Sequence, residues 1–285
     1  MKHNKTSLFR RKPQDVFLSV ITYGAAVIAV SVLAFLVGYV VIKGVPNLKP
    51  SMFSPQYTSE NVSVVPALIT TIEMTALSLL IAVPLGVFTA IYLVEYASRK
   101  NKLVGVIRIT AETLSGIPSI VYGLFGMLFF VTALGWGFSL IAGAFTLSIM
   151  ILPLIMRTTE EALKSVPDSF REGSFGLGAG RLRTVFRIVL PAAVPGILSG
   201  VILAIGRIVG ETAALIYTAG TVAQTPTSLT DSARTLSVHM YALSSEGLHT
   251  NEAYATALIL LVMVIGINAL ASYAAKRLSA EHSSP

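Results

Sequence analysis

The 285-residue sequence contains no cysteine, and this absence excludes several kinds of chemistry. Disulfide bonds, thiol catalysis and cysteine-ligated metal sites all need that side chain. The four histidines do not take its place, because they are scattered without the spacing of metal ligands. We therefore expect no metal site. These histidines are His3, His239, His249 and His282.

Charged residues are also scarce. They make up 12% of the chain, against roughly 25% in an ordinary soluble domain. Hydrophobic residues make up 54%, and the mean hydropathy is +0.75. The net charge of +7 does not indicate nucleic-acid binding, because the basic residues lie between long apolar runs and form no basic stripe. The composition predicts an all-α integral membrane protein.

Long apolar runs are what the sequence has in abundance. A helix needs about 20 mostly apolar residues to cross a bilayer, and six stretches qualify with varying clarity. Gly135, Trp136 and Gly137 alone separate the third stretch from the fourth, so we expect an antiparallel hairpin with Trp136 at the membrane interface. The predicted spans are Phe17–Ile42, Val65–Val94, Ile117–Leu134, Phe138–Met156, Pro191–Tyr217 and Ala253–Ala275.

The basic residues predict how these spans are oriented. With the N-terminus in the cytoplasm, 17 of the 21 Lys and Arg residues fall on the cytoplasmic side, as the positive-inside bias requires. We therefore expect a basic cytoplasmic segment 1–16, a first transmembrane helix 17–42 and a cytoplasmic tail 276–285. The first apolar run exceeds the roughly 7–15 residues of a signal peptide, so it is predicted to remain in the mature protein.

Two polar regions are longer than a connection requires: 157–190 on the cytoplasmic side and 218–252 on the external side. Such length usually indicates a function. A third segment, Ser98–Gly116, mixes charged and apolar residues, and it is predicted to be an interfacial helix that ends near Pro118.

Region 157–190 contains a spaced motif. A three-residue group is followed after three residues by a glycine, and after nine more by Ile-x-Leu-Pro. Gly178 can adopt the positive φ that a turn between two helices needs, and Pro191 suits a helix start. The alternative interpretation is a plain amphipathic loop with glycines at its turn. The motif consists of Glu172, Gly173, Ser174, Gly178, Ile188, Leu190 and Pro191.

This spacing resembles that of the cytoplasmic loop motif of ABC importer permeases. Where that family has two alanines, this sequence has Gly173 and Ser174. The resemblance implies an ABC importer type I permease fold over residues 65–275, with cytoplasmic coupling helices that dock on an ATP-binding subunit. No Lys-Ser or Lys-Thr follows the loop glycines, so they do not form a P-loop. We expect ATP and its magnesium on that partner. This chain is predicted to be a transport subunit rather than an enzyme, with no catalytic residue and no cofactor of its own.

The fifth apolar run contains two charged residues, Arg207 and Glu211, in the outer half of the membrane. A charge there costs about 2.5–3.5 kcal/mol on insertion scales, so such residues usually face a protein interior or an aqueous path. Their spacing of four places them on one helix face, where they can pair. Both are candidate translocation residues, and Glu211 would either hold the guanidinium in place or accept a proton from a protonated phosphate. The guanidinium matches an oxyanion bidentately, which favours an anion as cargo. The alternative is a buried ion pair that only locks helices together.

Glycines accompany this pair. Gly196 with Gly200, and Gly206 with Gly210, form two small-xxx-small patterns that allow a second helix to approach closely. Glu73, in the outer third of the second run, is a further candidate. It either meets Arg207 across the path or hydrogen-bonds to neighbouring threonines.

Three segments narrow the family further: Ile91–Ala97, Leu114–Gly126 and Gly206–Thr212 resemble the phosphate-specific ABC importer permeases. Segment Tyr241–Ala257 is similar to the PstA branch rather than the PstC branch. The resemblance implies a multi-pass protein of the bacterial cell membrane, embedded in the lipid bilayer, that pairs with a PstC-type second permease. It also implies an ATP-binding homodimer inside and a phosphate-binding protein outside.

We therefore predict ATP-driven import of inorganic phosphate by alternating access. Arg207 alone does not distinguish phosphate from other oxyanions, so a sulfate or molybdate permease remains an alternative. A secondary anion transporter would need no ATPase and would often show inverted repeats, which we do not find. A membrane-embedded enzyme is not supported, because the sequence offers no nucleophile with a matching base.

Overall fold

The computed structural model describes residues 13–98 and 101–281, and every regular element in these two ranges is helical. The all-α prediction is therefore confirmed. Most of the predicted basic segment 1–16, Arg99, Lys100 and residues 282–285 of the predicted tail lie outside the described residues. The α-helices are α1 (Pro13–Gly44), α2 (Val65–Ile91), α3 (Lys102–Ser115), α4 (Ser119–Gly126), α5 (Leu140–Ser165), α6 (Asp168–Gly176), α7 (Arg181–Thr184), α8 (Leu190–Val209), α9 (Ala213–Ile216), α10 (Leu236–Glu246) and α11 (Thr250–Glu281).

Shorter helical segments extend or join these helices. The 3₁₀ turns η1 (Val45–Asn47) and η2 (Pro50–Phe53) follow α1. Three π-helical segments lie next to α-helices: η3 (Tyr92–Tyr96) after α2, η4 (Met127–Ala133) after α4 and η5 (Val185–Val189) between α7 and α8.

Five described stretches are long and apolar enough to cross a membrane, and a bent pair of helices adds a sixth if it forms one span. The prediction of about six spans is therefore confirmed. The five stretches are Phe17–Asn47, Val65–Tyr96, Leu140–Ser165, Arg181–Val209 and Thr250–Tyr273.

The bent pair consists of α3 and the helix Ser119–Ala133, which meet at an angle of 104°. Pro118 explains the bend, because a proline disfavours helical backbone at the residue before it and cannot donate a backbone hydrogen bond. The predicted end of the interfacial helix near Pro118 is confirmed. The third predicted span, Ile117–Leu134, reaches the required length only together with α3.

The fifth predicted span, Pro191–Tyr217, is wrong at both ends. The helical stretch begins at Arg181 and ends at Val209. Pro191 stands in the first turn of α8, directly after the π-helical segment η5, so the helical stretch continues across a residue that has no N–H to donate. Beyond Gly210 the chain leaves the helix and forms the four-residue α9.

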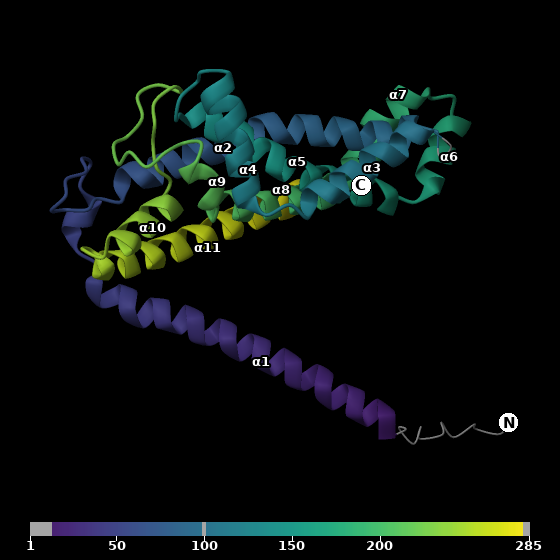
Figure 1. Cartoon of the computed structure of the whole chain (residues 1–285). Helices are drawn as coiled ribbons and strands as arrows, with labels where there is room; N and C mark the ends of the chain where they lie inside the picture. The colour runs from purple at the N-terminus through teal and green to yellow at the C-terminus, as the bar shows by residue number, and fades with distance from the viewer. Residues whose placement is uncertain (1–12, 99–100, 282–285) are drawn as a thin grey trace.

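Helices α2, α5 and α8 form the centre of the bundle (Figure 1). The α2–α5 pair is close-packed, because a Cβ at Gly86 would lie only 2.8 Å from Cγ2 of Ile155. Met74, Leu147 and Ile208 belong to the buried core that these helices share. This core fixes the positions of the side chains at both ends of the bundle.

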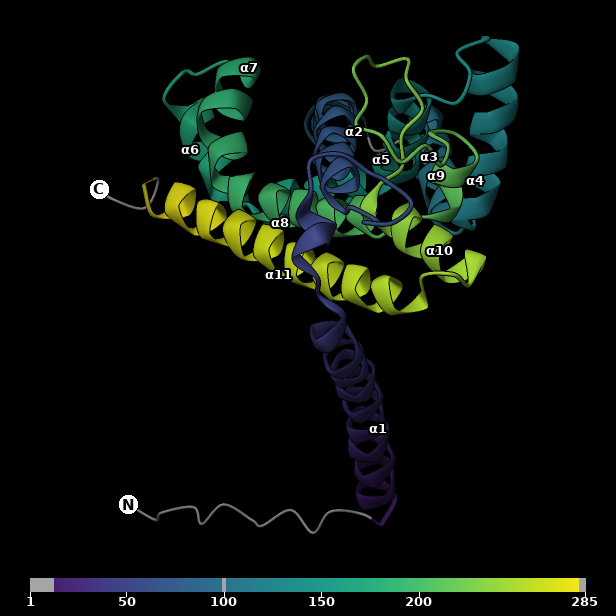
Figure 2. The same cartoon turned by 90° about the vertical axis from the view of Figure 1, so that its left-hand side faces the viewer.

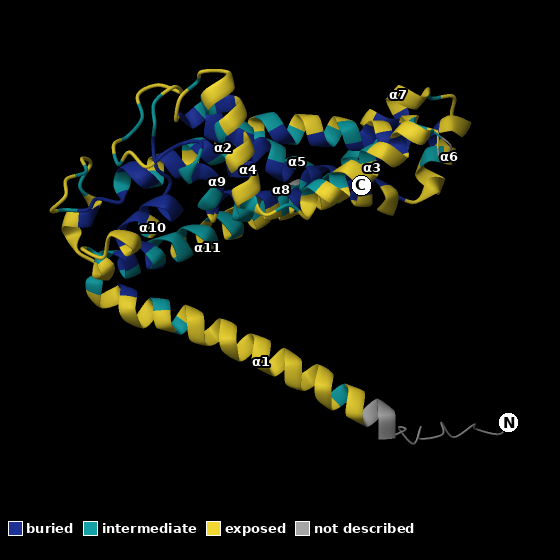
Figure 3. Cartoon of the chain, in the orientation of Figure 1, coloured by how far each residue is buried: buried dark blue, intermediate teal, exposed yellow. Residues whose placement is uncertain are grey.

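Helix α1 diverges from the rest of the molecule (Figure 2). It joins the bundle at its C-terminal end, where the rings of Tyr39 and Tyr254 lie 5.9 Å apart. Its other described side chains are exposed almost throughout, as Figure 3 shows. An apolar helix with all sides exposed requires lipid or another protein chain around it.

The bundle has two polar ends, which we name the α6 end and the α10 end (Figure 1). The α6 end carries α6 and α7, within the predicted cytoplasmic region 157–190. The α10 end carries η1, η2, α9 and α10, and the predicted external region 218–252 includes α10. The predicted hairpin turn is present, and Trp136 stacks on Phe130 with ring centroids 5.3 Å apart.

Candidate functional site

The spaced motif folds into two short helices at the α6 end. Helix α6 carries Glu172, Gly173 and Ser174, and the chain turns at Gly178, where φ is +81°. The predicted positive φ is therefore confirmed. The hydroxyls of Ser174 and Thr184, 2.8 Å apart, join α6 to α7. The loop is thus a helix, a turn and a second helix that continues into α8.

The outer surface of this loop is open. Large apolar side chains stay exposed on it, and Leu177 is 91% exposed. A Cβ at Gly173 or Gly178 would meet no atom of another element within 4 Å in the part of the chain that the structure describes. Ile188, Leu190 and Pro191 are half-buried where the loop rejoins the bundle. The loop therefore offers a partner an apolar surface that its own chain does not cover.

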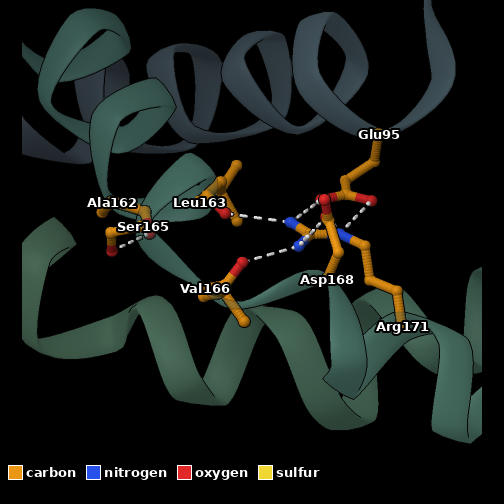
Figure 4. A network of polar contacts seen from close by, with 7 residues as sticks. All are labelled: Glu95, Ala162, Leu163, Ser165, Val166, Asp168 and Arg171. Carbon is orange, nitrogen blue, oxygen red and sulfur yellow. Dashed lines mark hydrogen bonds and ion pairs between the residues drawn. The ribbon is translucent and has the colours of Figure 1, made fainter.

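Arg171 of α6 joins this loop to two other helices (Figure 4). Its Nη2 lies 2.7 Å from Oε1 of Glu95 in η3, and its Nε donates to the same oxygen at 3.2 Å. Nη2 also donates to the Leu163 carbonyl at 2.9 Å, and Nη1 donates to the Val166 carbonyl at 2.8 Å. Nη1 further contacts the Asp168 carboxylate at 3.2 Å. One guanidinium therefore holds α6, η3 and the end of α5 together.

This ion pair is largely shielded from solvent, because the side chains of Arg171 and Glu95 are 15% and 8% exposed. Hydrogen bonds with Glu95 raise the pKa of Arg171, although burial acts to lower it. Nearby, the guanidinium of Arg181 lies 5.3 Å from the ring centroid of Tyr96, also in η3. An open cavity of about 630 Å³ lies beside these contacts and is lined by residues of both α6 and η3.

Arg207 lies in the last turn of α8, half-buried. It forms no ion pair or hydrogen bond with the described residues. Tyr122 of α4 is near enough to experience its charge. An unpaired guanidinium at the end of an apolar span is available to an anion.

Glu211 does not pair with Arg207, contrary to the i,i+4 expectation. The helix ends between them, and Oε1 of Glu211 accepts a hydrogen bond from the backbone N–H of Ala214 at 3.0 Å. The Glu211 carbonyl accepts a hydrogen bond from the Ser237 hydroxyl at 2.6 Å. Glu211 therefore caps α9 and anchors the start of α10, since side-chain oxygens satisfy the free N–H groups of a helix start.

The glycine patterns of α8 have separate outcomes. Gly196 and Gly200 pack against α5 as predicted, because a Cβ at Gly200 would overlap the Thr158 hydroxyl and one at Gly196 would lie 2.6 Å from Ala162. A Cβ at Gly206 would have no atom of another described helix within 4 Å, and Gly210 follows the end of the helix. Within residues 13–98 and 101–281 the outer pattern therefore makes no close helix contact.

Glu73 of α2 lies beneath the loop that precedes α10. It lines a cavity of about 360 Å³ together with loop residues 226–229, and its Oε2 is buried without a hydrogen-bond partner among the described residues. It forms no ion pair with Arg207 within that part of the chain. Within the described residues Oε2 forms a hydrogen bond with neither Arg207 nor a neighbouring threonine, and the role of Glu73 stays a prediction. Hydrogen bonds from Thr227 and Ser228 hold the loop closed and keep the pKa of Asp231 below its usual value.

A charged cavity between α3 and α5 was not predicted. Glu160 is buried there, and its Oε1 lies 2.5 Å from Nη2 of Arg108 and 2.6 Å from Nζ of Lys164. Arg157 and Glu161 also line this cavity, whose volume is about 240 Å³. The run of charges at helical spacing within residues 157–164 is the sequence signal that identifies this face.

A second unpredicted cluster lies at the α10 end. Arg234 is 6% exposed, its guanidinium lies 4.7 Å from the ring centroid of Tyr57, and Nε and Nη2 have no acceptor among the described residues. His239 lies beside them, and burial together with the charge of Arg234 lowers its pKa to about 3. No sequence pattern pointed to this cluster, because residues 57, 234 and 239 meet only through the packing of distant segments.

Comparison with known proteins adds family evidence to this geometry. Residues 82–280 match the family model described as "binding-protein-dependent transport system inner membrane component". A probable ABC transporter permease protein of Bacillus subtilis, YqgI, is 37% identical over 244 residues, which cover 79% of this chain and 81% of that protein. The phosphate transport system permease protein PstA 1 of Mycobacterium tuberculosis is 42% identical over 154 residues. That match covers 54% of this chain and 50% of the length of the relative.

Solved structures support the fold alone. A bacterial alginate ABC transporter, crystallised in complex with an alginate pentasaccharide-bound periplasmic protein, has a chain that aligns with a TM-score of 0.70. The alignment covers 93% of this chain and 96% of that chain at 16% identity. The arrangement of helices is therefore that of an ABC importer permease.

Proposed function

The chain belongs to the binding-protein-dependent transport system inner membrane component family, and on this premise we propose that it is the permease subunit of an ATP-driven importer of inorganic phosphate. As a member of that family it is a multi-pass protein of the cytoplasmic membrane. Phosphate as the cargo is supported by the PstA relatives, which are named as phosphate transport system permeases.

The observation that carries this proposal is the unpaired Arg207 at the end of an apolar span. A guanidinium offers a planar set of donors that matches a tetrahedral oxyanion, and inside a membrane its charge needs a counter-ion. No described residue of this chain supplies that counter-ion to Arg207. A passing oxyanion fits this position. Glu73, beneath the α10-end loop, is proposed to lie along the same path.

The partners follow from surfaces that this chain leaves open. We propose that the α6–α7 loop docks on a homodimeric ATP-binding subunit, which binds ATP and magnesium and hydrolyses ATP. The exposed α1 and the outer part of α8 around Gly206 are proposed to contact a second, PstC-type permease. The α10 end is proposed to face outside and to receive phosphate from a binding protein.

The mechanism proposed is alternating access. Closure of the ATP-binding subunits moves the α6–α7 loop, which continues into α8 through α7 and η5. Helix α8 carries Arg207 at its opposite end, so movement of the loop changes the position of the guanidinium relative to α4 and α2. Phosphate that reached Arg207 from outside is then released toward the cytoplasm.

One experiment tests this function without assuming the cargo. The chain is co-purified with its ATP-binding and permease partners, and ATPase activity is measured with binding protein loaded with phosphate, sulfate or molybdate. We expect phosphate to give the largest stimulation. Stimulation by sulfate or molybdate but not by phosphate would reject phosphate as the cargo, and purification without any ATP-binding partner would reject the importer.

A further inference from the structure

Helix α2 is not adjacent in sequence to the coupling loop 157–190, yet the π-helical turn η3 that follows α2 touches that loop at two points. Glu95 of η3 binds Arg171 at 2.7 Å, and Tyr96 lies under Arg181 at 5.3 Å. Arg171 belongs to α6, and Arg181 begins α7. Both short helices of the loop therefore contact the same π-helical turn, η3, which directly extends α2.

The Arg171–Glu95 pair has the geometry of a rigid joint. The guanidinium shares its donors among the Glu95 carboxylate and the carbonyls of Leu163 and Val166 at the end of α5. These carbonyls lie at a helix end, where an arginine supplies donors that the helix lacks. Bidentate, largely desolvated pairs of this kind hold their orientation better than single surface contacts.

A displacement of α6 that passes through the Arg171–Glu95 pair would reach the α10 end of the bundle. Helix α2 packs along α5, where the Ser148 hydroxyl bonds to the Ser78 carbonyl at 3.1 Å. At its other end α2 carries Glu73, beneath the α10-end loop. A displacement of α6 is thus passed to the external end of α2 as well as to α8.

We propose that the Arg171–Glu95 ion pair is a positioning element that forces α2 to follow the coupling helix, so that this chain converts closure of its partner into movement of two helices rather than one. This inference rests on the proposed function, because it assigns a role within ATP-driven transport. Neither residue touches the cargo. Both set the position of helices that do.

The test measures phosphate transported per ATP hydrolysed by the complete complex in proteoliposomes. Glu95→Gln removes one charge and keeps the side-chain shape; Arg171→Met removes the other, and a double variant removes both. We expect each of the three to lower the transport ratio by about tenfold, a typical coupling effect between sites. The double variant should be no worse than Arg171→Met. Co-purification of each variant with its permease and ATP-binding partners at the wild-type ratio shows that the chain is still folded and assembled.

The lack of native cysteine in this chain allows a rescue experiment. In a Glu95→Cys, Arg171→Cys double variant, a bifunctional methanethiosulfonate reagent, which joins the two cysteines through disulfides, should restore the ratio, and dithiothreitol, which reduces those disulfides, should abolish it again. Wild-type complex treated with the same reagent controls for thiols on partner chains. Arg157→Met is the matched control, because it breaks a 3.2 Å ion pair with Glu161 that lies within α5 alone and joins no two helices, so it should leave the ratio unchanged.

The outcomes of these experiments distinguish a failure of the proposed Arg171–Glu95 joint from a failure of the proposed phosphate import. Wild-type complex that shows no ATP-dependent phosphate uptake would reject the proposed function. With an active wild type, a normal ratio in the double variant would overturn the joint. A cross-linked cysteine pair that stays uncoupled would overturn it as well.

Discussion

The carboxylate of Glu211 binds the backbone N–H of Ala214 at 3.0 Å, while the guanidinium of Arg207, four residues earlier, has no ion pair among the described residues. The two residues therefore have different roles. Glu211 holds the junction of α8, α9 and α10 in shape. Arg207 keeps its donors available.

This division predicts that Glu211 variants act on stability. Glu211→Ala removes the cap of α9 and should cost about 1 kcal/mol, as helix caps typically do. Glu211→Gln keeps an acceptor oxygen and should behave as wild type. Thermal unfolding of the purified chain in detergent measures both. An alanine variant as stable as wild type would show that the cap does not stabilise this junction.

The turn at Gly178 provides a second prediction. Its φ of +81° is unfavourable for a β-branched residue, and Gly178→Val should cost about 1–2 kcal/mol locally and distort the α6–α7 turn. We expect stimulated ATPase activity to be lost while membrane insertion persists. Gly178→Asn should retain coupling, because asparagine tolerates left-handed backbone. Equal activity of the Val and Asn variants would contradict a role for the turn geometry.

The two glycine patterns of α8 predict opposite responses. Gly200→Ala would force a methyl group against Thr158 of α5 and should lower stability by about 1–3 kcal/mol. Gly206→Ala would meet no other described helix and should leave the stability of the isolated chain unchanged or slightly higher. Thermal unfolding of the chain purified alone compares them. Equal losses at both positions would contradict the packing of α8 on α5.

His239 predicts how stability depends on pH. Its folded-state pKa of about 3 lies below the ordinary value of 6.5, owing to burial and the charge of Arg234, while the nearby Val62 backbone acts in the opposite direction. Protonation therefore favours the unfolded chain. The histidine's contribution to stability is complete above pH 6.5 and is lost as the pH falls toward 3, at up to about 1.4 kcal/mol per pH unit.

His239→Phe should flatten this part of the pH profile, because phenylalanine keeps the edge contact with Tyr57 but has no proton to gain. Denaturant unfolding in detergent measures, for both proteins, how the free energy of unfolding changes between roughly pH 7 and pH 4. Over this range the histidine gains a proton in the unfolded chain but stays neutral in the folded chain. Identical slopes would assign the acid sensitivity to other groups.

The sequence predicted most helices because a spanning helix needs a long apolar run, whatever it packs against. The break after Val209 escaped prediction, since an apolar run resumes at Ala213 directly beyond Gly210, Glu211 and Thr212. It depends on Glu211 capping α9 and on Ser237 binding the Glu211 carbonyl, a contact between residues 26 apart. Local pattern does not contain that information.

The sites show the same limit. The glycine turn of the coupling loop was predicted because it depends on a local spacing and on one positive φ. The Arg171–Glu95 joint was not, because its partners are 76 residues apart and meet only through the packing of α2 on α5. Glu95 lies in Ile91–Ala97, a segment that indicates the family but not a contact. Its neighbours in the sequence do not identify it as a partner of Arg171.

The most direct test of the account is labelled phosphate uptake by proteoliposomes that contain the complete complex, with wild-type chain or with Arg207→Gln. We predict uptake that requires ATP and binding protein, persists in excess sulfate, and falls about tenfold or more in the variant, since a charge-assisted hydrogen bond is lost. Unchanged uptake by an assembled Arg207→Gln complex would contradict the central claim.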